Sequence, residues 1–203
     1  MIKRLFDILM SGIGLIASAP IFFLITIVII IDNKGPVLFF QRRMGRNFKP
    51  FTLYKFRTMV ENAAQEGLLI TVGGDPRITR IGKYLRRTKL DELPQLINVI
   101  KGDMSLVGPR PEIEEYVRLY DSDYKEILKF RPGVTDLASL NYINEENLLK
   151  GKEDPEIFYI NFLLSEKIRL AKEYMKISSF SNDLKIILLT FYNIIRCFCT
   201  RNY

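Results

Sequence analysis

The longest feature of the hydrophobic pattern is a run of 24 uncharged, mostly apolar positions from Ile8 to Ile31, bounded by Asp7 and Asp32. A helix of that length can cross the ~30 Å hydrocarbon core of a bilayer. Pro20 lies near the middle of the run, two residues after Ser18. A proline inside a helix removes a backbone hydrogen bond and kinks the helix. The pattern therefore predicts a membrane helix that is broken at its centre, around Ser18 and Pro20.

Charges on both sides of this run bear on its topology. Lys3 and Arg4 precede it, and residues 33–60 carry seven cations and no acid. Because cationic flanks favour the cytoplasmic side, both ends of the helix are drawn to the same face. Two topologies follow with equal weight: a simple span, and a re-entrant hairpin that enters and leaves one leaflet. A cleaved signal peptide fits less well, because the apolar run continues well beyond the small residues at 17–19.

After the membrane helix, the pattern predicts a small β-hairpin followed by short helices. Stretches 36–41 and 51–57 are rich in Phe, Val, Leu and Tyr, and residues 45–47 supply the turn between them. Residues 78–87 have a helical pattern, and Thr88 is expected to cap the next helix with Asp91 in a capping box. The core-facing side chains expected from that second helix are Leu96, Val99 and Ile100.

The rest of the chain reads as mainly helical. Helical patterns cover 112–130, 155–175 and 180–198, and a polar segment of unassigned role covers 144–154. The last of these helices is expected either to pack on the domain or to lie as an amphipathic helix in the membrane interface. The predicted fold is thus α+β and mainly helical, with a membrane helix at residues 1–33 and a membrane-associated catalytic domain at 34–203.

Composition narrows the chemistry. The 203 residues carry a formal net charge of +7 and no histidine. Thirteen of the thirty Lys and Arg fall in two acid-free windows, 33–60 and 76–90. Such a balance predicts anionic partners, namely phosphates, anionic lipids or nucleic acid. The absence of histidine removes the commonest general base and a common zinc ligand.

Asp91 and Glu92 directly follow the second cationic window. One carboxylate of such a pair can attack a phosphorus atom while the other holds a divalent metal such as Mg²⁺. A capping box followed by a solvated Glu is the more common interpretation of this local sequence. Further on, Pro109 and Pro111 flank Arg110 and fix its backbone, which would pre-aim the guanidinium, and an ordinary turn with an exposed Arg is the alternative.

Several ordered motifs resemble the bacterial sugar transferase family, the monotopic phosphoglycosyl transferases that start polyprenol-linked glycan assembly. The resemblance runs from about Lys3 to Leu189. Its main motifs are Lys55-Phe56-Arg57-Thr58-Met59, Arg77-Ile78-Thr79-Arg80-Ile81-Gly82-Lys83, Leu90-Asp91-Glu92-Leu93-Pro94-Gln95-Leu96, Gly108-Pro109-Arg110-Pro111 and Arg131-Pro132-Gly133.

The resemblance implies transfer of a sugar-1-phosphate from a UDP-sugar to undecaprenyl phosphate, with UMP as the second product. It implies a ping-pong route in which Asp91 forms a phosphosugar-aspartyl intermediate and Glu92 binds Mg²⁺. A re-entrant helix would hold the site at the cytoplasmic face of the bacterial plasma membrane. A homodimer is left open, and no nucleic acid is expected. The substrate- and phosphate-binding residues expected on this basis are Lys55, Arg57, Arg80, Arg87, Gln95, Pro109, Arg110, Pro111 and Arg131.

Other interpretations of the same residues stand beside this one. The basic windows also suit a non-catalytic adaptor at the membrane surface, and a degenerate transferase could act as a scaffold for glycan assembly. After Arg131-Pro132-Gly133 the sequence departs from the family pattern, with Asp136 in place of a Gly and Ser139 in place of a Gln. The sugar therefore cannot be inferred from the resemblance.

Overall fold

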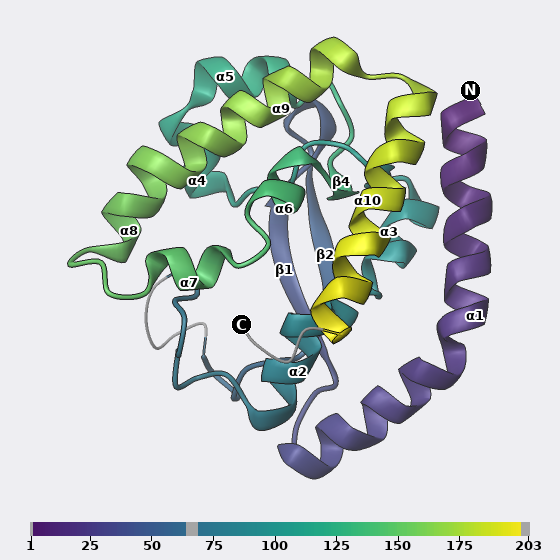
Figure 1. The fold of residues 1–203 in the computed structure, drawn as a ribbon, viewed down its shortest axis with the longest axis vertical. Coiled ribbons are helices and arrows are strands. Elements are labelled where there is room, and N and C mark those ends of the chain that lie inside the picture. Colours follow the sequence, from purple (N-terminus) through teal and green to yellow (C-terminus); the bar gives the residue numbers. More distant parts are fainter. Residues whose placement is uncertain (1, 64–68, 200–203) are drawn as a thin grey trace.

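The computed structural model describes residues 2–63 and 69–199. The hydrophobic run forms α1 (Ile2–Asp32), which continues through Pro20 and is bent in Figure 1. Ser18 Oγ donates to the carbonyl oxygens of Gly14, at 2.6 Å, and Leu15, at 3.3 Å. A serine that bonds back to the preceding turn favours a bend in a helix, as does the proline. Helix α1 is bent, as expected, but it is not broken, and the assignment of the bend to Ser18 and Pro20 stays a prediction.

A β-hairpin and two short helices follow α1. The hairpin pairs β1 (Leu38–Met44) with β2 (Pro50–Phe56) in antiparallel register and turns through a 3₁₀ segment, Arg46–Phe48. Next come α2 (Arg80–Thr88) and α3 (Gln95–Lys101). The hairpin and the α2 helix were predicted, and both are confirmed.

Two expectations for this region are wrong. Thr79, not Thr88, is an N-cap: its side chain accepts from Gly82 N and begins α2. Thr88 is the last residue of α2, and its hydroxyl donates to the Tyr84 carbonyl oxygen at 2.7 Å. Pro94 delays α3 until Gln95, so no capping box forms. Ile100, which was expected to face the core, is 40% exposed, whereas Val99 is fully buried as expected.

The C-terminal half is built from short helices and one small parallel sheet that the pattern did not predict. The elements in chain order are β3 (Ser105–Val107), α4 (Glu114–Leu119), α5 (Asp121–Ile127), β4 (Gly133–Thr135), α6 (Leu137–Asn141), α7 (Glu145–Leu149), α8 (Pro155–Phe158), a π-helical turn (Tyr159–Leu164), α9 (Ser165–Ile177) and α10 (Phe180–Cys199). The single helix expected over 112–130 is divided at Tyr120, while the helical run expected from 155 is confirmed across the π turn.

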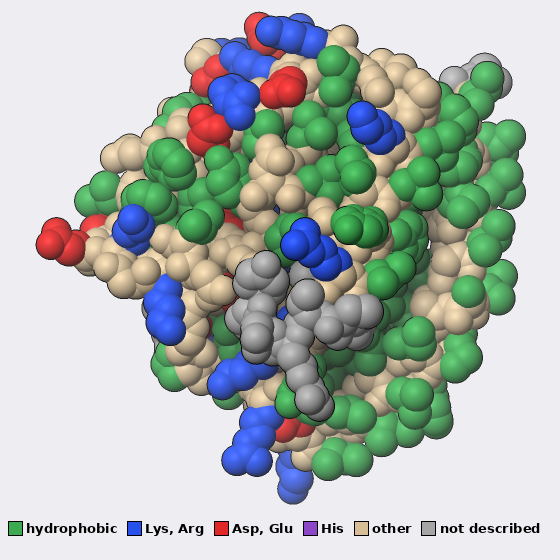
Figure 2. Space-filling view, in the orientation of Figure 1, with side chains coloured by type: hydrophobic (Ala, Val, Ile, Leu, Met, Phe, Trp, Pro, Cys, Tyr) green, Lys and Arg blue, Asp and Glu red, His purple; other side chains and the backbone are tan. Residues whose placement is uncertain are grey.

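Helix α10 packs on the domain along one face, as one of the two expectations had it, and exposes apolar side chains on the other. Asp183 and Ile186 are buried against the domain, whereas Leu188, Phe191 and Ile195 are each at least 60% exposed. In Figure 1, α10 lies beside α1, and Figure 2 shows hydrophobic side chains gathered along the edge that α1 forms. Only 17% of the most apolar stretch of α1 is buried, so α1 is not a core helix of a soluble domain.

Both ends of α1 are attached to the rest of the fold. Near its start, Lys3 pairs with Asp183 at 2.7 Å, and Asp7 accepts a hydrogen bond from Ser105 Oγ at 2.8 Å. At its end, Asp32 accepts from Ile81 N at 3.2 Å, and Arg57 donates to the carbonyl oxygens of residues 33 and 34. The two arms of the bent helix therefore return to one domain.

Candidate active site

Asp91 and Glu92 lie in a 3₁₀ turn, Leu90–Glu92, between α2 and α3. Lys89 ends α2 in the left-handed conformation, with φ 57°, and reverses the chain so that the turn can form. A residue other than glycine is uncommon in this region and costs about 1 kcal/mol or more, so the surrounding structure holds it there. The turn places the two neighbouring carboxylates in different surroundings.

The Asp91 carboxylate is buried without a complete set of partners. Asp91 is 6% exposed, and its Oδ1 has no hydrogen-bond partner among the described residues. Burial raises the pKa of Asp91, and the negative charge of Glu92 adds to this effect, while Lys55, Lys89 and Arg86 oppose it. A helix N-terminus favours the charged form of a carboxylate, but Asp91 lies in the turn before α3 and not in its first turn. In the structure, the charged form of Asp91 is favoured only by the charges of Lys55, Lys89 and Arg86, and its Oδ1 has no hydrogen-bond partner among the described residues.

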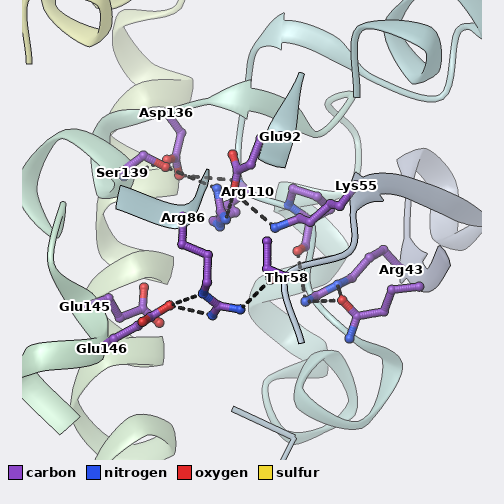
Figure 3. Close-up of polar contacts among 12 residues, drawn as sticks. Arg43, Lys55, Thr58, Arg86, Glu92, Arg110, Asp136, Ser139, Glu145 and Glu146 are labelled. Atoms are coloured by element: carbon purple, nitrogen blue, oxygen red, sulfur yellow. Dashed lines mark hydrogen bonds and ion pairs between the residues drawn. The ribbon is translucent and has the colours of Figure 1, made fainter. Parts of the chain in front are cut away.

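Glu92 is the opposite case. Its Oε1 accepts from Lys55 Nζ at 3.1 Å and from Arg110 Nη2 at 2.8 Å (Figure 3). Burial acts to raise the pKa of Glu92, but Arg110 and Lys55 outweigh it and hold that pKa well below the usual range. In turn, the Glu92 charge raises the pKa of the Arg110 guanidinium. One carboxylate is thus firmly ionised, and its neighbour is the harder of the two to ionise.

Lys55 and Arg110 reach Glu92 from elements far apart in the chain. Lys55 is carried by β2, and Arg110 by the loop between β3 and α4. The buried Asn98 of α3 helps to hold Lys55 near Glu92 by attaching β2 to α3. Its Nδ2 donates to the Thr52 carbonyl oxygen at 2.7 Å, and its Oδ1 accepts from Tyr54 N at 3.1 Å. The hairpin is therefore attached to the helix that follows the dyad.

A second carboxylate cluster borders the site and was not predicted. Arg86 of α2 donates to Glu146 Oε1 at 2.8 Å from Nε and to Thr58 Oγ1 at 3.2 Å (Figure 3). Glu146 belongs to α7, inside the polar 144–154 segment whose role the sequence left unassigned. The neighbouring Glu145 pairs with Lys167 at 2.8 Å. The segment therefore connects α2 to α9 beside the dyad. In the sequence, the adjacent acids Glu145 and Glu146 were the signal that could have indicated such a role.

A buried ion-pair network lies behind Arg110. Glu112 pairs with Arg43 at 3.1 Å and accepts from Tyr159 Oη at 3.0 Å, and Lys167 lies 3.6 Å from it. Burial acts to raise the pKa of Glu112, but Lys167 and Arg43 hold it below its usual value. The network joins β1 to α9 across the segment that carries Arg110, and sequence reasoning did not single out these residues.

The structure brings together Asp91, Glu92, Lys55 and Arg110, and gives other surroundings to Arg57 and Arg131. Arg57 holds the end of α1, as described above. Arg131 Nε donates to the Gly102 carbonyl oxygen at 3.0 Å, at the opposite end of α3 from the dyad. Of the other predicted residues, Gln95, Pro109 and Pro111 are buried, whereas Arg80 and Arg87 are exposed on α2.

The donor set suits a divalent ion that is shared with a substrate. Among residues 2–63 and 69–199 there is no group of three or more His, Cys, Asp or Glu that could hold a metal. Mg²⁺ commonly uses one or two carboxylates together with substrate phosphates and waters. The adjacent carboxylates of Asp91 and Glu92, one with an unpartnered oxygen, fit that kind of site and not an all-protein cage.

Comparison with known proteins decides the family. The model of the bacterial sugar transferase family matches residues 1–197. The chain belongs to this family. The family assignment made from the sequence is therefore confirmed, and the family and the long apolar helix together agree with a membrane-associated sugar transferase.

Three relatives illustrate the range of the family. The UDP-N-acetylgalactosamine-undecaprenyl-phosphate N-acetylgalactosaminephosphotransferase of Aeromonas hydrophila is 39% identical over 80% of the chain and 40% of its own length. The undecaprenyl-phosphate glucose phosphotransferase of Komagataeibacter xylinus is 37% identical over 93% of the chain and 35% of its own length. The exopolysaccharide production protein ExoY of Sinorhizobium fredii is 40% identical over 70% of each chain. The chain thus spans less than half of the first two relatives, which are named for different sugars.

Proposed function

We propose that this protein transfers a sugar-1-phosphate from a UDP-sugar to undecaprenyl phosphate, giving a polyprenyl diphosphate sugar and UMP. The family and the names of its relatives support the acceptor and the type of reaction. The observation that carries the proposal is the buried, unpartnered Oδ1 of Asp91 beside an ion-paired Glu92. A scaffold or adaptor gains nothing from such a costly group, whereas a nucleophile must keep its attacking oxygen free.

The reaction proceeds in two displacements at one phosphorus. An Asp91 oxygen attacks the β-phosphorus of the UDP-sugar, and the bond from that phosphorus to the bridging oxygen breaks, so that UMP leaves with the electron pair. A phosphate oxygen of the lipid then attacks the same phosphorus, and the bond to Asp91 breaks. No base is required for the first step, because the nucleophile is a carboxylate.

Cations around the dyad support both displacements. Lys55 and Arg110 converge on Glu92 within 3.1 Å, at a site where side chains are only 12–28% exposed. Charges in such a place act more strongly on a bound phosphate than they would in water. Glu92 would hold Mg²⁺ together with the donor diphosphate, which leaves the free Asp91 oxygen for attack. When bound, the ion would neutralise charge that develops on the departing phosphate.

We also propose that α1 is re-entrant and that the domain sits on the cytoplasmic face of the bacterial plasma membrane. Measured at 1.5 Å per residue, the arms before and after the bend are about 25 Å and about 20 Å long. Each arm is shorter than the ~30 Å core, and each ends on the same domain. The lipid acceptor lies in the bilayer, so this placement keeps the dyad at headgroup depth.

Asp91→Asn tests the function directly. With undecaprenyl phosphate and either UDP-N-acetylgalactosamine or UDP-glucose, we expect wild-type protein to release UMP and Asp91→Asn to lose release by at least about a thousandfold. Asp154→Asn serves as the matched control, because Asp154 is an exposed N-cap of α8 and should leave the rate unchanged. Transfer by Asp91→Asn at the wild-type rate would rule out the covalent route.

The metal proposal has its own test. Removal of Mg²⁺ with EDTA should abolish UMP release, and Glu92→Gln should weaken Mg²⁺-dependent binding of the UDP-sugar as measured by calorimetry. Full activity in EDTA, or unchanged Mg²⁺ dependence in Glu92→Gln, would count against a metal held at Glu92.

A further inference from the structure

The loop that carries Arg110 between Pro109 and Pro111 packs backbone to backbone against β4. Gly133 N donates to the Pro109 carbonyl oxygen at 2.9 Å, and Gly108 N donates to the Thr135 carbonyl oxygen at 3.2 Å. A Cβ atom on Gly133 would lie 2.1 Å from Gly108 N, so no other residue fits at this approach. This packing brings Asp136, the first residue after β4, beside Arg110.

The Asp136 carboxylate joins the start of α6 to the Arg110 backbone. Its Oδ1 accepts from Ser139 N at 2.7 Å as the N-cap of α6, and its Oδ2 accepts from Arg110 N at 3.3 Å. Asp136 is only 4% exposed, and the Ser139 hydroxyl lies 3.5 Å from Arg110 Nη1 (Figure 3). Both oxygens of the carboxylate are therefore engaged within the protein, which leaves Asp136 no direct part in substrate contact.

We propose that Asp136 and Ser139 are positioning residues that set how Arg110 holds the diphosphate of the nucleotide sugar. The inference rests on the proposed function. Arg110 reaches Glu92 with Nη2 while Asp136 fixes its main chain and Ser139 approaches Nη1. The guanidinium thus lies between the Glu92 carboxylate and the Ser139 hydroxyl before the donor arrives, and the Asp136 carboxylate holds the main chain behind it. An arginine that is pre-oriented in this way loses less side-chain entropy when it binds a phosphate.

Asp136→Ala removes the carboxylate that accepts from Arg110 N. Its effect is measured as UMP release with UDP-N-acetylgalactosamine and with UDP-glucose. We expect the KM for the nucleotide sugar to rise about tenfold, as for the loss of one well-formed polar contact, with a smaller change in kcat. In an Arg110→Ala background the same change should alter KM less than about twofold, because its effect passes through Arg110. Independent, multiplying effects of the two substitutions would overturn the proposal.

Matched variants separate this role from a general loss of structure. Asp154→Ala removes an N-cap of the same kind from α8, where Asp154 accepts from the backbone N–H groups of Glu156 and Ile157, and should leave KM unchanged. Asp136→Asn keeps the shape and one acceptor oxygen, and should raise KM less than Asp136→Ala with little change in melting temperature. An unaltered KM in Asp136→Ala would contradict the inference, as would an equal rise in Asp154→Ala.

Calorimetric binding of UDP-N-acetylgalactosamine distinguishes failure of this inference from failure of the proposed function. Weaker donor binding by Asp136→Ala than by the wild-type protein supports the positioning role. If the wild-type protein binds the donor but releases no UMP, only the proposed reaction is overturned. Equal donor binding by the wild-type protein and Asp136→Ala overturns the positioning role and leaves the reaction untouched.

Discussion

Asp91 is a residue that the fold tolerates at a cost. Its carboxylate is buried with one oxygen unpartnered, and its pKa is raised chiefly by burial. At a pH above both its folded and unfolded pKa values, the ionised group therefore lowers the stability of the fold. Below the unfolded value this penalty is absent. A group retained under such conditions is typical of a site where stability is given up for chemistry.

Asp91→Asn is accordingly expected to stabilise the protein while it abolishes transfer. The gain at neutral pH should be about 1–3 kcal/mol, because the neutral amide lacks the buried charge, and it should shrink as the pH falls through the pKa of Asp91. Thermal unfolding in detergent micelles at several pH values measures it. The exposed Asp154→Asn should show no gain. A lower melting temperature for Asp91→Asn at neutral pH would contradict this account.

The pH dependence of UMP release follows from the same two carboxylates. As the pH falls, Asp91 should become protonated first and lose its nucleophilicity, because its pKa is above the ordinary 3.8 while that of Glu92 is well below its usual range. The Lys55 charge lowers the pKa of Asp91, so Lys55→Met should move the acid limb of kcat to higher pH. The exposed Lys176→Met is the control. A limb that moved to lower pH in Lys55→Met would refute the assignment.

At the residue scale, the sequence predicted the four residues that the structure brings together, but not the contacts of the outer cations. Asp91, Glu92, Lys55 and Arg110 were predicted, because carboxylates and cations in ordered motifs indicate phosphate chemistry. Arg57 and Arg131 belong to the same motifs, yet each donates to backbone carbonyl oxygens at the end of a helix. Nothing in a linear pattern shows which carbonyl groups a fold leaves unpaired.

At the scale of elements, the contact between β2 and α3 determines the geometry of the dyad. Asn98 supplies it by hydrogen bonds to the main chain of residues 52 and 54, and it is fully buried. Lys55 lies one residue beyond this contact, and Glu92 lies just before α3. A shift of the hairpin against α3 would therefore separate Lys55 from Glu92.

Asn98→Ala should destabilise the protein by on the order of 3 kcal/mol, because it leaves a buried N–H and a buried carbonyl unpaired. UMP release should fall by more than the folded fraction explains, since the 3.1 Å contact of Lys55 with Glu92 would loosen. Chemical denaturation and activity of the remaining folded protein measure the two effects. Asn182→Ala removes an exposed amide contact of α10 and should change neither. Full activity in folded Asn98→Ala would show that the contact serves stability alone.

The elements that the sequence did not predict depend on contacts over long separations. The pair β3 and β4 has three residues in each strand, and 25 positions separate their ends, so no local alternation indicates it. The expected cap at Thr88 had the right residue type, but Lys89 in the left-handed conformation ends α2 there instead. The hairpin and the long helices were predictable because their periodicity is local.

For the molecule as a whole, the attachments of α1 determine what its apolar surface can do. Lys3 and Asp7 hold one end and Asp32 the other, and all three contact the same domain. A helix that crossed the bilayer would have to break one set of these contacts. The cost would include an uncompensated buried Asp183, which pairs with Lys3 at 2.7 Å and is 4% exposed.

A cysteine at the start of α1 tests this topology. Ile2 is 75% exposed, so Ile2→Cys, in a background with Cys197→Ser and Cys199→Ser, presents a single accessible thiol. In intact bacterial cells a membrane-impermeant maleimide should leave it unlabelled, and after permeabilisation it should react as fully as Glu153→Cys on the domain surface. Ile16→Cys, in the arm before the bend, should stay unreactive in both cases, because a thiol in hydrocarbon ionises poorly. Labelling of Ile2→Cys in intact cells while Glu153→Cys stays protected would place the two ends of α1 on opposite faces, and the contacts of Lys3 and Asp7 with the domain could not then exist in the membrane.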